Sequence, residues 1–371
     1  MKYCYLFILQ ISALTLGCFT PMLSQSQENE SGSDAAIKSG LASQSLLLDI
    51  ARHGDRIVTV GERGHVLYSD DLGKSWVQAN VPVRSTLTSV TLLENNTAWA
   101  VGHHGVVLRS RDGGENWQLI LRGQDINEIL TLDAQARLKT LTSDEPIEEN
   151  RLKIDQARYF LSETLLFQQE GESRPLLKVW FENQATGYIL GAYGILLKTE
   201  DGGDRWVGWQ QHIENDDLYH LYDITPLAES RLMVGEGGHL YKQNDNQIDW
   251  KKIISPYGGT FFGISASPKS HIALVYGLRG NIFRTTDAGD SWTPVDSGIA
   301  DSILDMTWTD PDTVIAVAAG GNVLKSDDGG ISFSKTTHPE RKTFTALLAL
   351  EGDQLIAVGQ GGISRLSEMT E

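Results

Sequence analysis

The chain has 371 residues, 37 of them glycine, and a formal net charge of −17 at pH 7. So acidic a chain is unsuited to nucleic acid or to an anionic membrane surface, because both need clustered lysine and arginine side chains. Its two cysteines, Cys4 and Cys18, both lie near the N-terminus. The rest of the chain therefore has no disulfide and needs a large core for its stability.

Residues 1–24 are typical of an export signal, with an apolar run from Leu6 to Leu16 followed by small and polar residues. The run is shorter than the roughly 20 apolar residues of a membrane-spanning helix. Two processing routes remain open. Small residues around Ser24 suit an ordinary signal peptidase, whereas Thr15 to Cys18 resembles a lipoprotein signal, with lipidation at Cys18. Residues 25–44, rich in Ser, Glu, Asn and Gly, indicate a polar tether.

Two short motifs recur along residues 45–371. The first, Ser/Thr-x-Asp-x-Gly-x-x-aromatic, is the Asp-box, and its five copies occupy residues 69–76, 110–117, 199–206, 285–292 and 326–333. The second is Gly-x-x-Gly, which begins at residues 61, 102, 191, 235, 277 and 359, with a worn copy at residue 318. Successive copies of this marker are 41 to 44 residues apart, except for one step of 89. A period near 40 built from short apolar runs predicts a seven-bladed all-β propeller, with one blade per marker.

Each Asp-box is expected in the hairpin between the third and fourth strands of a blade. Its glycine adopts a backbone angle that other residues avoid, and its aspartate accepts hydrogen bonds from N–H groups of the turn. The aromatic residue then packs between blades. We interpret the boxes as structural, since none has the bidentate glutamate at the twelfth position of a calcium loop.

The seventh repeat, which begins at Phe344, ends before a fourth strand. An open ring would leave an unpaired strand edge. We therefore predict that Ala35 to Leu41, or a neighbouring stretch, pairs with that edge and closes the ring.

The long step contains an insertion from Gly123 to Pro175, between blades two and three. Apolar residues recur at helical spacing in two runs, separated by a break at residues 143–146. This pattern predicts a helical hairpin. Connections between blades emerge on the face that carries the Gly-x-x-Gly turns, so the hairpin is expected beside these turns and the mouth of the central channel.

The variable residues of the Gly-x-x-Gly turns are the candidate partner-binding residues, because polar and aromatic side chains on turns of a rigid scaffold are typical of binding sites. The residues selected are Arg63, His103, His104, Tyr193, Glu236 and Arg279. The alternative is that each is only a solvated turn residue. The adjacent histidines do not indicate a metal site, because their side chains diverge and a site needs three or four converging ligands. No catalytic residue, metal or cofactor is predicted.

The repeated Val-Gly-x-x-Gly and Thr/Ser-x-Asp-Gly-Gly-x-x-Trp motifs resemble the photosystem II stability and assembly factor family over nearly all of residues 45–366, apart from the insertion. This resemblance implies a non-catalytic protein exported to the thylakoid lumen, or to the periplasm in a non-photosynthetic relative. It also implies that the protein binds a membrane protein or an assembly intermediate, with peripheral or lipid-anchored membrane association. The family's arginine patch would correspond here to Arg63 and Arg279, and to Arg109 and Arg284 beside the boxes.

Asp-boxes also occur in sialidase-like glycoside hydrolases, which are the alternative. Such an enzyme needs an arginine triad, a tyrosine nucleophile with a glutamate partner, and an acidic aspartate at the propeller mouth. The Phe/Tyr-Arg-Ile-Pro motif of sialidases is absent, and Tyr193 with Glu236 lacks three arginines in register. We therefore expect a binding protein rather than an enzyme.

Overall fold

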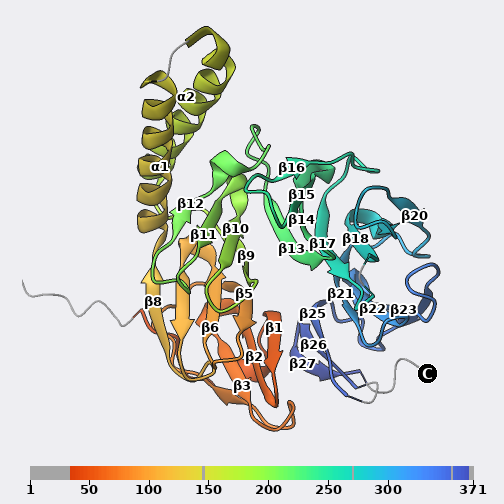
Figure 1. The fold of residues 1–371 in the computed structure, drawn as a ribbon. Helices are drawn as coiled ribbons and strands as arrows, with labels where there is room; N and C mark the ends of the chain where they lie inside the picture. The colour runs from red at the N-terminus through yellow and green to blue at the C-terminus, as the bar shows by residue number, and fades with distance from the viewer. Residues whose placement is uncertain (1–33, 144–146, 270, 352–353, 367–371) are drawn as a thin grey trace, which may run out of the picture. The chain divides into compact units, whose positions relative to one another are not determined.

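The structure is a computed structural model that describes residues 34–143, 147–269, 271–351 and 354–366. The predicted signal, residues 1–24, lies outside the described residues. Strands β1 to β27 form seven antiparallel sheets arranged as the blades of a ring (Figure 1). The innermost strands contact one another in chain order, and β25 of the last blade contacts β1 of the first. The predicted seven-bladed propeller is therefore confirmed.

The strands of each blade follow one another from the centre of the ring outwards. Blades one and two comprise β1 (Leu47–His53), β2 (Arg56–Gly61), β3 (Val66–Ser69), β4 (Val77–Gln78), β5 (Leu87–Leu92), β6 (Ala98–Gly102), β7 (Val107–Ser110) and β8 (Trp117–Leu121). Blades three and four comprise β9 (Leu176–Phe181), β10 (Gly187–Gly191), β11 (Leu196–Thr199), β12 (Val207–Gly208), β13 (Leu221–Leu227), β14 (Ser230–Gly235), β15 (Leu240–Asn244) and β16 (Lys251–Lys252). Blades five to seven comprise β17 (Phe261–Ala266), β18 (Ala273–Gly277), β19 (Ile282–Thr285), β20 (Thr293–Val295), β21 (Ile303–Trp308), β22 (Val314–Ala318), β23 (Asn322–Ser326), β24 (Ser334–Thr337), β25 (Phe344–Ala349), β26 (Leu355–Gly359) and β27 (Gly362–Arg365).

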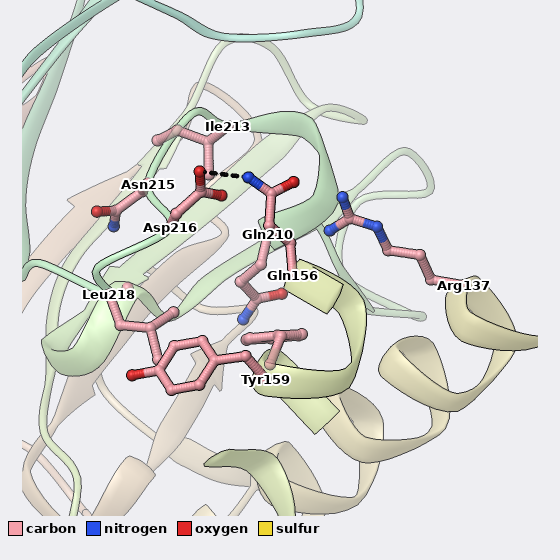
Figure 2. Close-up of a pocket in the computed structure, with 10 residues that line it drawn as sticks. Arg137, Gln156, Tyr159, Gln210, Ile213, Asn215, Asp216 and Leu218 are labelled. Carbon is pink, nitrogen blue, oxygen red and sulfur yellow. Dashed lines mark hydrogen bonds between the residues drawn. The ribbon is translucent and has the colours of Figure 1, made fainter. Parts of the chain in front are cut away.

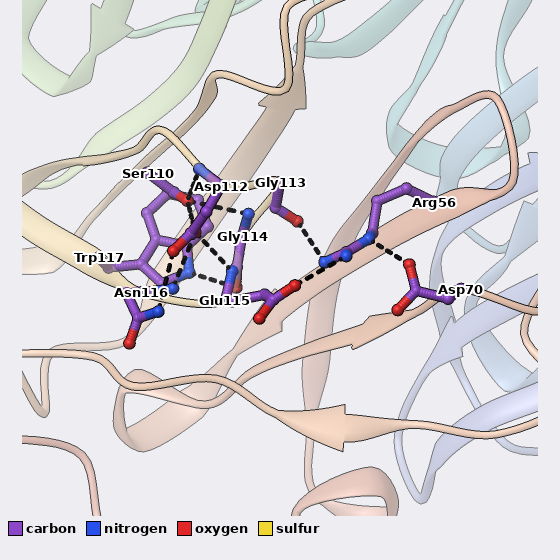
Figure 3. A network of polar contacts seen from close by, with 9 residues as sticks. All are labelled: Arg56, Asp70, Ser110, Asp112, Gly113, Gly114, Glu115, Asn116 and Trp117. Atoms are coloured by element: carbon purple, nitrogen blue, oxygen red, sulfur yellow. Dashed lines mark hydrogen bonds and ion pairs between the residues drawn. The ribbon is translucent and has the colours of Figure 1, made fainter.

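The Asp-box of blade two shows how these turns are held (Figure 3). The Asp112 carboxylate accepts hydrogen bonds from the backbone N–H groups of Glu115 and Asn116, at 3.1 and 3.0 Å. The backbone N–H of Gly114 donates to the Ser110 hydroxyl at 2.9 Å, and its φ of 90° is in the range that favours glycine. The indole N–H of Trp117 donates to the Gly114 carbonyl at 2.9 Å. The box is thus a self-contained turn, as the sequence predicts.

In several blades an arginine side chain binds the Asp-box of the next blade. Arg56 of blade one donates to the Gly113 carbonyl and the Glu115 carboxylate in the box of blade two, at 3.0 and 2.9 Å (Figure 3). Arg109 of blade two pairs with Asp204 of blade three at 2.7 Å, and Arg284 of blade five donates to the Gly329 carbonyl of blade six at 2.7 Å. Arg109 and Arg284, which the family resemblance places in an arginine patch, thus both bind the Asp-box of the neighbouring blade.

The predicted ring-closing strand is absent from the described residues. Blade seven has three strands, and the segment from Ala35 to Leu41 lies along blade one instead, where the Ala36 N–H donates to the Val81 carbonyl at 2.9 Å. Apolar packing between blades seven and one takes the place of the strand, in a cluster that includes Leu47, Ile57, Ala346, Ile356 and Val358. Arg365 of β27 also donates to the Leu72 carbonyl of the first Asp-box at 2.6 Å. The neighbouring turn Ala42–Gln44 packs against β27 without forming a strand, so this turn and side-chain contacts together close the ring.

The insertion forms the predicted hairpin, with helices α1 (Gly123–Ser143) and α2 (Ile147–Glu170) projecting from blades two and three (Figure 1). Its base is part of the core, because Ile126, Leu130, Phe160 and Phe167 share one buried cluster with Trp99 of β6. Helix α1 contacts the outer strands β8 and β12 and a Gly-x-x-Gly turn of blade two. No helix of the described residues is long and apolar enough to cross a membrane.

Candidate functional site

The Gly-x-x-Gly turns, called marker turns below, each hold their third residue in a constrained backbone conformation. In four of them this residue is not glycine and adopts left-handed backbone angles, namely Arg63 (φ 56°), His104 (φ 60°), Tyr193 (φ 55°) and Arg279 (φ 58°). For a residue with a side chain this conformation costs about 1–2 kcal/mol. All four side chains are exposed. Such backbone strain under exposed side chains is typical of binding surfaces.

Two of the predicted residues, Tyr193 and Glu236, are brought together by His220. The Nδ1 atom of His220 lies 3.0 Å from the Glu236 carboxylate, and its ring centroid lies 5.1 Å from that of Tyr193. Glu236 also accepts a hydrogen bond from the backbone N–H of His220 at 3.3 Å. The marker turns of blades three and four are therefore joined through the residue that immediately precedes strand β13.

These side chains belong to a longer series of rings, which we call the aromatic run: Phe167, Tyr193, His220, Tyr222 and Phe262. Successive ring centroids are 6.1, 5.1, 6.3 and 5.7 Å apart. The run starts on α2, crosses the marker turn of blade three and ends on the innermost strands β13 and β17. Tyr193 is 48% exposed, and the last three rings are half-buried. The run is therefore a partly exposed aromatic surface between the hairpin and the centre of the ring.

Arg174 stacks on two rings of the aromatic run. Its guanidinium carbon lies 3.6 Å from the ring centroid of Phe167 and 5.2 Å from that of Tyr193. The side chain is buried and forms an ion pair with Glu170 near the end of α2. A desolvated guanidinium stacked on aromatic rings contributes about 2 kcal/mol. Arg174 thus fixes the hairpin base relative to the marker turn that bears Tyr193.

The other predicted residues do not join the aromatic run. Arg63 and Arg279 lie on the marker turns of blades one and five. His103 and His104 lie on the turn of blade two, where His104 Nδ1 is 3.1 Å from the Ser85 hydroxyl. In the part of the chain that the structure describes, no three histidine, cysteine, aspartate or glutamate side chains are arranged to hold a metal ion.

Carboxylates at the centre of the ring have a structural role that the sequence did not reveal. Asp49, Asp223 and Asp305 each accept a hydrogen bond from a backbone N–H of the next blade's innermost strand, at 2.9, 3.1 and 2.7 Å. They satisfy the strand edge that faces the ring centre. Lys178 lies 3.3 Å from Asp223. Burial opposes its charge, but the three carboxylates together raise its pKa above the ordinary value.

A small pocket lies between the hairpin and the connection from blade three to blade four (Figure 2). Its volume is about 50 Å³. Arg137, Gln156 and Tyr159 line it from the hairpin, and Gln210 and Asp216 line it from the connection. Because Gly194 of the blade-three marker turn also lines the pocket, it opens beside Tyr193.

The burial of Asp133 predicts that docking of the hairpin depends on pH. It lies on α1 against Gly208 of β12, where burial raises its pKa to about 6 although His212 and Arg137 act in the opposite direction. Since this pKa exceeds the unfolded value of about 3.9, the stabilising contribution is complete below pH 4 and is lost as pH rises through 6. We expect Asp133→Asn to raise the melting temperature at pH 7.5 and hardly change it at pH 4. Melting curves of both proteins that stay parallel across this range would contradict this assignment.

The family described as "Photosynthesis system II assembly factor YCF48" matches residues 23–131 and 166–300, which is more than half of the chain. The photosystem II assembly protein Ycf48 of Thermosynechococcus vestitus is 20% identical over 297 residues, covering 78% of this chain and 83% of that protein. The photosystem II assembly lipoprotein Ycf48 of a Synechococcus species is 23% identical over 163 residues, which cover 43% of this chain. The photosystem II stability/assembly factor HCF136 of Arabidopsis thaliana is 28% identical over 173 residues, covering 41% of this chain. The matched parts span 48% and 40%, respectively, of the lengths of the last two relatives.

Solved structures agree with this fold. One described as "YCF48 bound to D1 peptide" has a TM-score of 0.62 and 16% identity, and the alignment covers 88% of this chain and 97% of that one. YCF48 from Cyanidioschyzon merolae has a TM-score of 0.61 at 18% identity, with 86% and 95% covered. The family match ends at residue 300 and skips residues 132–165, which make up most of the hairpin. By its repeats, its seven blades and this match, the chain belongs to the photosystem II assembly factor YCF48 family.

Proposed function

We propose that this protein is a non-catalytic assembly or stability factor that binds a segment of a membrane protein at the aromatic run. The observation that carries the proposal is a half-exposed Tyr193, held in a left-handed turn and linked by ring contacts to Phe167 and His220. Aromatic side chains on rigid turns are enriched at the energetic centres of protein interfaces. The structural neighbour described as bound to a D1 peptide supports a peptide segment as the ligand.

Export belongs to the same proposal. Residues 1–24 carry the features of a signal, and relatives are described as a lipoprotein and as chloroplastic. We infer a location in the periplasm, or in the thylakoid lumen of a photosynthetic host, with Cys18 as the lipid-anchoring residue. Loss of membrane association in a Cys18→Ser variant is the expected result, and unchanged fractionation would exclude the anchor.

The experiment is an affinity capture from membranes of the native host, with the tagged mature protein as bait. The matched bait lacks residues 132–165, most of the hairpin, and melting curves of both baits control for folding. We expect one membrane complex to be recovered by the intact bait and reduced with the shortened one. Recovery of no specific complex by a folded intact bait would overturn the proposal. Turnover of a fluorogenic sialoside by the purified protein would instead favour the glycoside hydrolase alternative.

A further inference from the structure

The pocket between the hairpin and the blade-three-to-four connection is built partly from residues outside the family match. Arg137, Gln156 and Tyr159 line it, and all three lie within residues 132–165, which the family match omits. The opposite wall comes from the propeller itself, through Gln210 and Asp216. The hairpin therefore adds a pocket at the edge of the aromatic run.

Gln210 contributes an unpaired hydrogen-bond acceptor to the pocket. Its side chain is only 8% exposed, and its Oε1 atom has no partner among the described residues. Figure 2 shows its amide directed into the pocket below Gln156. A buried polar atom without a partner is destabilising, so a ligand that donates a hydrogen bond to it gains affinity from that contact.

The charges that line the pocket are opposite in sign. The Asp216 carboxylate accepts a hydrogen bond from the Gln156 amide at 2.8 Å, and the Arg137 guanidinium reaches toward both glutamines from α1 (Figure 2). A carboxylate ligand would be attracted by Arg137 but repelled by Asp216, and an ammonium ligand would meet the reverse. A neutral group that both donates and accepts hydrogen bonds meets no repulsive charge and complements both side chains.

A carboxamide has this chemistry and a suitable size. Its NH₂ group donates to Gln210 Oε1 or to Asp216, and its oxygen accepts from Arg137. A buried water needs about 10–15 Å³ of such space. A volume of about 50 Å³ therefore accommodates a group of three or four non-hydrogen atoms, and a carboxamide has three.

We propose that this pocket binds the side-chain carboxamide of an asparagine or glutamine in the segment that lies on the aromatic run. This inference rests on the proposed function, because it assumes that such a segment binds there. Gly194 lines the pocket and directly follows Tyr193, so one extended segment can contact both the ring and the pocket. Side chains two positions apart in such a segment point to the same face, about 6.6 Å from each other.

The test uses the full mature chain with ¹⁵N-labelled glutamine and follows the side-chain amide resonances of Gln156 and Gln210. Propionamide, propionate and n-propylammonium are titrated separately at millimolar concentrations. We expect propionamide to shift both resonances in a saturable way and the two ions to have at least tenfold weaker effects. Gln210→Met should abolish the saturable shift at Gln156. The exposed neighbour Gln211→Met is the matched control and should leave it unchanged.

Three outcomes would overturn the inference: propionate binds more tightly than propionamide, n-propylammonium binds more tightly than propionamide, or no probe gives a saturable shift. The last outcome would mean that water occupies the pocket. These probes report on the pocket without any partner protein. Failure of the capture experiment with a positive propionamide titration would therefore refute the proposed function while the pocket's specificity stands. A successful capture experiment with a negative propionamide titration would refute carboxamide binding by the pocket and leave the proposed function intact.

Discussion

Gly203→Ala is expected to destabilise the propeller by about 2–5 kcal/mol, the sum of backbone strain and overpacking. Gly203 lies in the Asp-box of blade three with a φ of 84°, and a β-carbon there would lie 2.3 Å from the indole of Trp99. That indole is fully buried, stacked on Phe181 at 5.6 Å and in edge contact with Trp206 at 5.8 Å. The ring therefore has no space into which it can move.

The control is Gly320→Ala, in the marker turn of blade six. Its φ of 71° imposes similar backbone strain, but the nearest atom to a new β-carbon is 3.8 Å away. Denaturant unfolding followed by tryptophan fluorescence should show a loss of only about 1–2 kcal/mol for this variant. Equal losses for the two variants would mean that the contact with Trp99 does not limit the packing of blades two and three.

Tyr193→Ala is expected to weaken partner binding by at least about 2 kcal/mol, or roughly 30-fold, the range of an interface hot spot. Its ring touches the rings of Phe167 and His220, yet about half of the side chain is exposed. Alanine is no worse than tyrosine in the left-handed conformation, and Arg174 keeps its closer stack on Phe167, so the melting temperature should fall only a little. The measurement is the dissociation constant of each variant for the captured partner, with the partner immobilised on a surface and the variant titrated over it.

Arg63→Ala is the matched control, because Arg63 occupies the equivalent position of the blade-one marker turn with nearly the same φ, 56°. It lies outside the aromatic run, so its removal should leave affinity within about threefold, the range of a contact outside the hot spot. If Arg63→Ala weakens binding as much as Tyr193→Ala, the partner lies across the whole face of the marker turns rather than on the aromatic run.

The repeats made most of the fold predictable. Each blade carries its own strand pattern and Asp-box turn, and the box at Asp112 is held by residues within eight positions. The helical hairpin was also predictable, because the apolar spacing of each helix is local. What failed was the closure of the ring. The route of Ala35 to Leu41 depends on whether blade one or blade seven offers better contacts, and neither contact is encoded in the segment itself.

The candidate site was predictable only in part. Tyr193 and Glu236 were candidates because they occupy the variable positions of the Gly-x-x-Gly turns, and in the structure both contact His220. His220, Tyr222 and Phe262 gave no such signal, because each resembles an ordinary residue at the start of an innermost strand. Arg174 was equally hidden, since its stacking on Phe167 and Tyr193 depends on how the insertion folds back on the ring. Contacts between repeats cannot be read from the pattern within one repeat.

The closure between blades seven and one bears on how such a ring accommodates inserted sequence. In the described residues no strand is shared across that junction, so the three-stranded blade seven is held against blade one by packing and by single side-chain bonds such as that of Arg365. A ring assembled in this way is modular. An insertion between two blades therefore breaks no strand ladder, which explains how the connection between blades two and three accommodates a helical hairpin.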